Sequence, residues 1–100
     1  MEKIEIRTKL LLSIQRALIG MIYPAIRAIA VEFLKLDELK VIVYLDREPI
    51  ESDYENLSDI TGEVLADIEF KKAEEICLCS KAIKLELKGE AIWVYMRKEG

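Results

Sequence analysis

The 100-residue sequence contains no histidine, and this absence narrows the chemistry that the chain can carry. Without an imidazole there is no histidine general base, no Ser-His or Cys-His dyad and no histidine-ligated metal site. The sequence also has only two cysteines, Cys77 and Cys79, with one residue between them. Thiols at this spacing form a poor disulfide and lack partners for zinc, so we interpret them as small hydrophobic side chains.

Long apolar runs and phosphate-binding loops are missing as well. No run approaches the roughly 18 apolar residues of a membrane-spanning helix, and no small-residue cleavage site follows the apolar cluster Leu10–Leu12. We therefore expect no signal peptide and a cytoplasmic location. The sequence has no glycine-rich phosphate loop, and no serine lies in a nucleophile motif with a base. These absences predict a protein that is not an enzyme and needs no cofactor.

What the sequence does contain is the composition of a folded domain, with 52% apolar and 34% charged residues. At this length the chain has room for one domain, spanning residues 1–100, with a modest core between two layers. A sheet covered by one or two helices satisfies that requirement.

Hydrophobic periodicity predicts two helices. Apolar residues recur at helical spacing at Leu11, Ile14, Leu18 and Met21, which predicts a helix over residues 4–19. A second helical pattern predicts a helix over residues 52–69, where Ser52 and Glu55 have the spacing of a capping box. Gly62 lies inside this second helix, where glycine is unfavourable, so we expect it to mark close packing against a neighbour.

Alternating apolar residues predict four strands in two hairpins. The first hairpin joins residues 25–34 to 40–46, and the second joins 76–87 to 91–97 with a bend at Ala82–Ile83. The element order therefore predicts an α+β fold, a two-layer sandwich of order α-β-β-α-β-β. In it a four-stranded, mainly antiparallel sheet carries two helices on one face.

Trp93, Tyr95 and Arg97 alternate along the last strand, so they are expected to share one face of it. Core packing is the expected role of Trp93 if the helices cover that face. If the face is open, aromatic and arginine side chains of this kind can anchor an interface.

The charge of the sequence is unevenly distributed. The net charge is −4, but residues 46–75 alone hold three basic and eleven acidic side chains, a net of −8. Within the second predicted helix four carboxylates recur every fourth residue and form one acidic line: Glu55, Asp59, Glu63 and Asp67. Like charges at this spacing destabilise a helix by a few tenths of a kcal/mol per pair.

Two interpretations of the acidic line stay open. It is either a solvated helix face that keeps the protein soluble, or a docking surface for a basic partner. In the second case Asp53 and Tyr54, at the start of the helix, belong to the same surface. A metal site is a weaker alternative, because ligands on one helix need others from a second element and no calcium-binding loop is present.

Five segments give the chain a resemblance that spans nearly its whole length. The segments are QRALIG at 15–20, PAIRAI at 24–29, YLDREP at 44–49, TGEVLADI at 61–68 and WVYMRKE at 93–99. With them the chain resembles small bacterial immunity proteins of polymorphic or contact-dependent growth-inhibition toxin systems. These motifs are structural rather than catalytic, so no site residue is carried over from the family.

The resemblance and the charge pattern imply the same function. Many toxins of such systems are nucleases, whose basic clefts hold phosphates, and an acidic helix can block such a cleft. The first hypothesis is an immunity protein that binds a toxin through Asp53, Tyr54, Glu55, Asp59, Glu63 and Asp67. The alternative is a small homodimeric structural or adaptor domain, without catalysis, that pairs through a sheet edge or an open sheet face. Neither hypothesis involves nucleic acid or a membrane as a direct partner.

Overall fold

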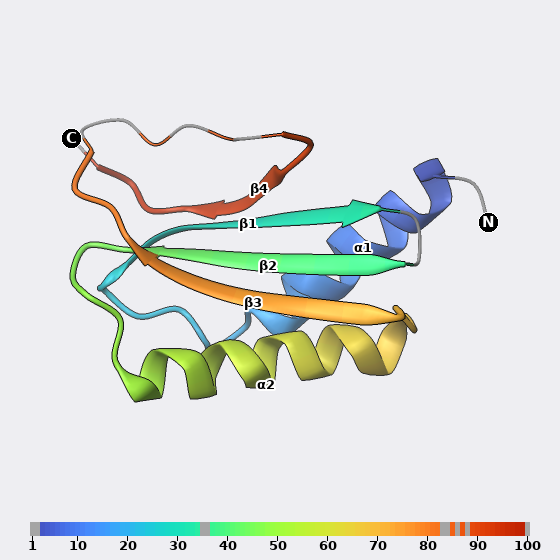
Figure 1. The fold of residues 1–100 in the computed structure, drawn as a ribbon, viewed down its shortest axis with the longest axis horizontal. Helices are drawn as coiled ribbons and strands as arrows, with labels where there is room; N and C mark the ends of the chain where they lie inside the picture. Colours follow the sequence, from blue (N-terminus) through green and yellow to red (C-terminus); the bar gives the residue numbers. More distant parts are fainter. Residues whose placement is uncertain (1–2, 35–36, 83–84, 86, 88, 100) are drawn as a thin grey trace.

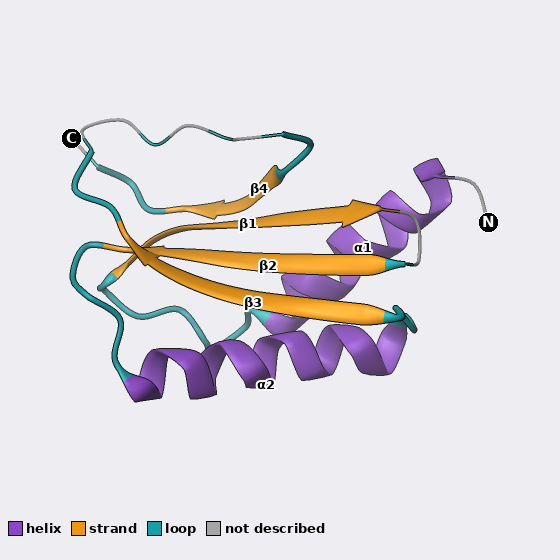
Figure 2. Cartoon of the chain, in the orientation of Figure 1, coloured by secondary structure: helices purple, strands orange, loops and turns teal. Residues whose placement is uncertain are grey.

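The computed structural model describes residues 3–34, 37–82, 85, 87 and 89–99, and within them it has two helices and a four-stranded sheet (Figures 1 and 2). The elements are α1 (Lys3–Ala17), β1 (Ile26–Leu34), β2 (Glu38–Leu45), α2 (Glu51–Asp67), β3 (Lys72–Cys79) and β4 (Ile92–Met96). The predicted order α-β-β-α-β-β and the α+β class are therefore confirmed.

The sheet is mixed, with the spatial order β3-β2-β1-β4. β1 is antiparallel to both β2 and β4, whereas β3 runs parallel to β2. The first predicted hairpin is therefore confirmed, and the sheet is mainly antiparallel. The second predicted hairpin is wrong, because β3 and β4 lie at opposite edges of the sheet (Figure 1).

The parallel pair follows from the length of α2. Its 17 residues span about 25 Å and carry the chain back to the edge where β2 begins. There Lys72 pairs with Glu38, so β3 runs in the same direction as β2. β3 ends at Cys79, so the alternation predicted to continue to residue 87 is not one strand. Of the predicted bend, Ala82 lies beyond the strand and Ile83 lies outside the described residues.

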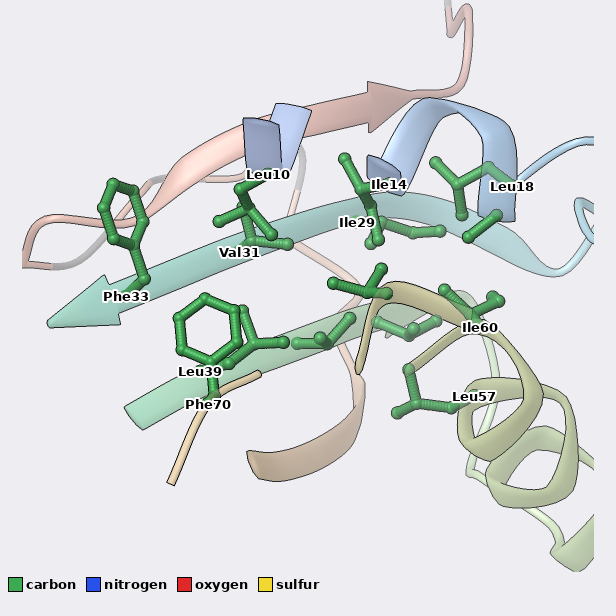
Figure 3. Packing of buried hydrophobic residues seen from close by; sticks show 14 of the residues in the cluster. Leu10, Ile14, Leu18, Ile29, Val31, Phe33, Leu39, Leu57, Ile60 and Phe70 are labelled. Atoms are coloured by element: carbon green, nitrogen blue, oxygen red, sulfur yellow. The ribbon is translucent and has the colours of Figure 1, made fainter. Parts of the chain in front are cut away.

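The core lies between the sheet and the two helices. Leu10 and Ile14 of α1 and Leu57 and Ile60 of α2 are fully buried and converge on the strands (Figure 3). Their partners in the sheet include Ile29, Val31, Phe33, Leu39, Val41, Val43 and Leu45. Burying a side chain of this size contributes roughly 1.5–3 kcal/mol, so the two apolar helix faces fix both helices on the same side of the sheet.

The face of the sheet away from the helices carries an aromatic pair. Ala30 of β1 lies between the buried Ile29 and Val31 and pairs with Trp93, so Trp93 points away from the helices. Its ring meets that of Tyr44 edge-on, with 5.4 Å between the centroids. Trp93 is half-buried and is not part of the core cluster, so the expectation that it packs in the core is wrong.

A bulge in β4 separates the side chains that were expected to share a face. Tyr95 pairs with Ile29 and Trp93 pairs with Ala30, so Val94 is an extra residue between them. Tyr95 consequently packs against the core, whereas Trp93 lies on the other face. The prediction of one common face for Trp93 and Tyr95 is wrong for this reason.

Candidate functional site

The six residues predicted to bind a partner all lie on α2, but their side chains are in different environments. Asp53 and Asp67 are bonded to other parts of the protein. Tyr54, Glu55, Asp59 and Glu63 are exposed. The structure therefore divides the acidic line into charges that hold the fold together and charges that face solvent.

Asp53 lies at the start of α2 and is only 2% exposed. Its carboxylate accepts two hydrogen bonds from the Arg47 guanidinium, at 2.7 and 3.0 Å, and one from the Tyr23 hydroxyl. It also accepts a hydrogen bond from the Ile50 amide at 2.8 Å, which caps the helix. The predicted cap formed by Ser52 and Glu55 is therefore wrong, because the N-cap residue is Ile50 and its amide donates to Asp53, three residues later.

These contacts change the pKa of both acidic groups involved. The hydrogen bonds from Arg47, assisted by those from Tyr23 and Ile50, lower the pKa of Asp53 to about 2 against the opposing effect of burial. Burial and the bond to Asp53 raise the pKa of Tyr23 above its usual value. Asp53 is thus a buried anion that ties α2 to the two segments preceding β1 and α2.

Asp67 lies at the other end of α2, where a carboxylate is disfavoured by the helix dipole. The Ser13 hydroxyl donates a hydrogen bond to it at 2.7 Å, and Arg16 forms an ion pair with the same oxygen. The Ser13 bond and the Arg16 charge lower the pKa of Asp67. Both partners come from α1, so Asp67 joins the two helices.

The remaining four predicted residues form one surface, which we call the acidic face of α2: Tyr54, Glu55, Asp59 and Glu63. Tyr54 is 46% exposed, and the three carboxylates are exposed as well. No lysine or arginine among the described residues pairs with these three carboxylates. Their charge is therefore uncompensated at short range and available to a partner.

An open groove of about 820 Å³ lies beside this face, where the end of α1 and the following turn meet α2. The turn contributes Ile19, whose side chain is 79% exposed. Gly62 lies in the floor of the groove, and a Cβ atom built there would meet nothing within 4 Å. The expectation that Gly62 marks close packing is therefore wrong. The groove lining consists of Arg16, Ala17, Ile19, Met21, Ser58, Asp59, Gly62, Glu63 and Ala66.

Sequence reasoning missed this groove. The available signal was the series Ser58, Gly62 and Ala66, three small residues at a spacing of four on the polar side of the helix. On an exposed helix face such a series leaves a shallow channel between larger neighbours. Nothing local to α2 indicated that Ile19 and Met21 would form the opposite wall, because they follow a different helix.

A second group of charges lies at the end of the sheet, and we call it the sheet-end cluster: Arg27, Asp46, Arg97 and Glu99. Arg27 is 6% exposed and donates two hydrogen bonds to Glu99, at 2.8 and 2.7 Å. Arg97 forms an ion pair with Asp46 at 2.8 Å and another with Glu99 at 2.8 Å. The bonds from Arg27, followed by those from Arg97, lower the pKa of Glu99 to about 2. Every member of this cluster is therefore paired.

The two cysteines lie on β3 and are both free thiols. Cys77 is buried, and burial raises its pKa to about 11, which keeps the thiol protonated and unreactive at neutral pH. Within the described part of the chain, no three Cys, Asp or Glu side chains are grouped so that they could hold a metal ion. Across the same residues, no helix has the length and apolar character needed to cross a membrane.

Comparison with known proteins adds one finding. A family model described as MafI2 immunity protein matches residues 7–99, which is nearly the whole chain. No curated protein matches the sequence.

Proposed function

The chain belongs to the MafI2 immunity protein family, and we propose that it neutralises a cognate toxin by presenting the acidic face of α2 to a basic surface. The proposed toxin is a nuclease domain, whose phosphate-binding cleft is basic. The proposed setting is the cytoplasm of a bacterium with a contact-dependent growth-inhibition or related system. The protein then acts by occupying a surface and needs no catalysis of its own.

The single observation that carries this proposal is that three carboxylates in a row have no basic partner among the described residues. Glu55, Asp59 and Glu63 are exposed at successive fourth positions of α2. Two other acids of the same helix are paired, Asp53 with Arg47 and Asp67 with Arg16. Repulsion between unpaired neighbours destabilises the helix slightly, so their arrangement is better explained by binding than by stability.

Unpaired surface charge acts on association more than on final affinity. A row of carboxylates attracts a basic partner and orients it, which raises the association rate constant at low salt. Tyr54 adjoins the row, and its ring supplies an apolar contact area of the kind that anchors interfaces. The proposed contact residues are therefore Tyr54, Glu55, Asp59 and Glu63, whereas Asp53 and Asp67 hold the helix in place.

The test uses, as the candidate toxin, the C-terminal domain of the protein encoded immediately upstream of this chain. Association is measured by stopped flow over a salt series for the wild type and for the double variant Asp59→Lys/Glu63→Lys. We expect the association rate constant of the variant to fall roughly tenfold or more at low salt, with a flatter salt dependence. Co-expression of the toxin domain should stop growth unless the wild-type chain is present.

The matched control is Glu5→Lys/Glu48→Lys, which makes the same change in net charge at exposed acids outside the acidic face. The control should retain most of the wild-type rate constant. If the association rate constant fell equally in both double variants, the overall charge of the protein would matter and the position of the charge on α2 would not. A toxin domain that kills cells despite the wild-type chain would contradict the immunity function for that pair.

A second candidate is self-association through the sheet face away from the helices. Leu78 of β3 and Met96 of β4 are 43% and 52% exposed, and Tyr44 of β2 meets Trp93 of β4 on that face. Light scattering during size-exclusion chromatography distinguishes a dimer from a monomer. If this face pairs two copies, Leu78→Glu should convert the dimer to a monomer.

A further inference from the structure

The groove between α1, the turn after it and α2 combines two properties that one kind of side chain satisfies. Its lining includes the apolar residues Ala17, Ile19 and Met21. It also includes Asp59 and Glu63, whose exposed carboxylates we call the rim of the groove. We propose that it receives a single lysine or arginine side chain from the toxin, with the aliphatic stem over Gly62 and the cation between the two carboxylates. This proposal rests on the proposed function and adds to it a specific binding site for one side chain of the toxin.

Ile19 gives the groove an exposed apolar surface. Its side chain is 79% exposed at the edge of the groove, although an isoleucine gains free energy when it is removed from water. Gly62 has no side chain, and a Cβ atom built at this position would meet nothing within 4 Å. The stem of a lysine or arginine has the length and apolar character to lie along such a channel.

The rim of the groove carries an excess of negative charge. Arg16 also lines the groove, but its cation is paired with Asp67. Asp59 and Glu63 therefore remain as two carboxylates without a cation among the described residues. A purely apolar or acidic segment placed here would remove both from water without a partner, which is unfavourable. A cationic head group compensates them.

The hollow at the sheet-end cluster lacks these properties and serves as a contrast. It measures about 500 Å³ and is lined by Arg27, Asp46, Arg97 and Glu99, which are already paired with one another. Lys81 and Lys98 also line it, so its free charge is positive. A basic toxin segment is repelled there and attracted to the groove beside α2.

The first test changes the shape of the groove without changing its charge. Gly62→Leu places a side chain in the open channel, and Ile19→Ala removes the exposed wall at a position where the fold does not need it. Binding to the same candidate toxin domain is measured by biolayer interferometry. We expect each variant to raise the dissociation rate constant roughly tenfold, with the association rate constant and its salt dependence nearly unchanged.

The matched control is Leu12→Trp, which enlarges an apolar side chain that is 60% exposed on α1 and does not line the groove. It should dissociate like the wild type. Thermal unfolding of all three variants identifies any that fail to fold. If Gly62→Leu does not fold, Ile19→Ala still decides the question, because its side chain makes little contact with the core.

The second test asks whether the same toxin side chain lies over Gly62 in the groove and also contacts the carboxylates of the rim. If it does, Gly62→Leu and Asp59→Asn each displace the same group, so the double variant should dissociate little faster than the worse single variant. Multiplicative effects would mean that two different parts of the toxin are involved and would overturn the proposal. Unchanged dissociation in Gly62→Leu and Ile19→Ala would overturn the groove while leaving the proposed function intact. Failure of the wild-type chain to bind the toxin domain would overturn both.

Discussion

The sheet-end cluster and the acidic face of α2 are the two most charged regions described above, and they use charge in opposite ways. In the sheet-end cluster two arginines and two carboxylates neutralise each other through ion pairs at 2.7–2.8 Å. On the acidic face three carboxylates lie without any cation of the described chain beside them. The first region joins β1 to the segments after β2 and β4, whereas the second forms no ion pair within the described chain and weakens its own helix slightly.

This difference shows that net charge alone says little about function. Asp53 and Asp59 are equally acidic in the sequence, yet one is a buried cap and the other a solvent-facing group. A charge with an internal partner is part of the fold. A charge without one is either a solubility device or a contact for another molecule, and membership of an immunity protein family favours the contact.

The largest expected effect comes from removing a paired acid. Asp53→Ala leaves the Arg47 guanidinium, the Tyr23 hydroxyl and the Ile50 amide without their shared acceptor. We expect the free energy of unfolding to fall by roughly 3 kcal/mol. Urea denaturation measures the change.

The comparison for that variant is Asp59→Ala on the same helix. Because Asp59 has no partner in the described chain, we expect its removal to change stability by less than about 0.5 kcal/mol. A similar loss in both variants would show that the distinction between paired and unpaired acids has no energetic basis.

The second prediction concerns the stability of the protein at low pH. The folded pKa of Asp53 is about 2, below its ordinary value of 3.8, so its stabilisation is fully present above pH 3.8 and is lost as the pH falls through 2. The contribution at neutral pH is about 2 kcal/mol. Glu99, with a pKa lowered from 4.5 to about 2, acts in the same direction.

A pH series of urea midpoints for the wild type and Asp53→Asn measures this contribution. The wild type should lose stability steeply on acidification, and the variant should start lower and lose less. Parallel curves for the two proteins would mean that Asp53 is not the titrating group.

The third prediction concerns Gly62 on the exposed side of α2. An added Cβ atom meets nothing within 4 Å, and alanine is a better helix former than glycine. Gly62→Ala should therefore stabilise the protein by about 0.5–1 kcal/mol. Thermal unfolding checks this, and destabilisation would show that the backbone at this position cannot accept a side chain.

The smallest expected effect is on the acidic face itself. Asp59→Lys replaces repulsion with Glu55 and Glu63 by attraction, so the free energy of unfolding should rise by about 0.5 kcal/mol. The same variant should associate more slowly with the toxin domain. If the acidic face were only a solvated surface, Asp59→Lys would raise stability without slowing association.

Much of the fold could be predicted from the sequence, because local periodicity determines it. Both helices and the β1–β2 hairpin follow from the spacing of apolar residues. The position of β3 could not be predicted in this way, because its parallel pairing depends on where α2 returns the chain. The bulge at Val94 was equally hidden, since it appears only when β4 is aligned with β1.

The candidate site shows the same limit. That α2 carries an acidic line is visible in the sequence, but the partners of Asp67 lie 51 and 54 residues away, on α1. No local pattern relates these positions. Arg47 is only six residues before Asp53, and this basic residue in an otherwise acidic segment was the one available sign that Asp53 is paired internally.

The position of β4 has a consequence for how the protein forms. β1 lies in the middle of the sheet, but its second neighbour is β4, which is synthesised after the other three strands of the described residues. Until residues 92–96 have emerged from the ribosome, one side of β1 exposes unpaired amide and carbonyl groups to other nascent chains. The four-stranded sheet is therefore complete only after translation has passed residues 92–96.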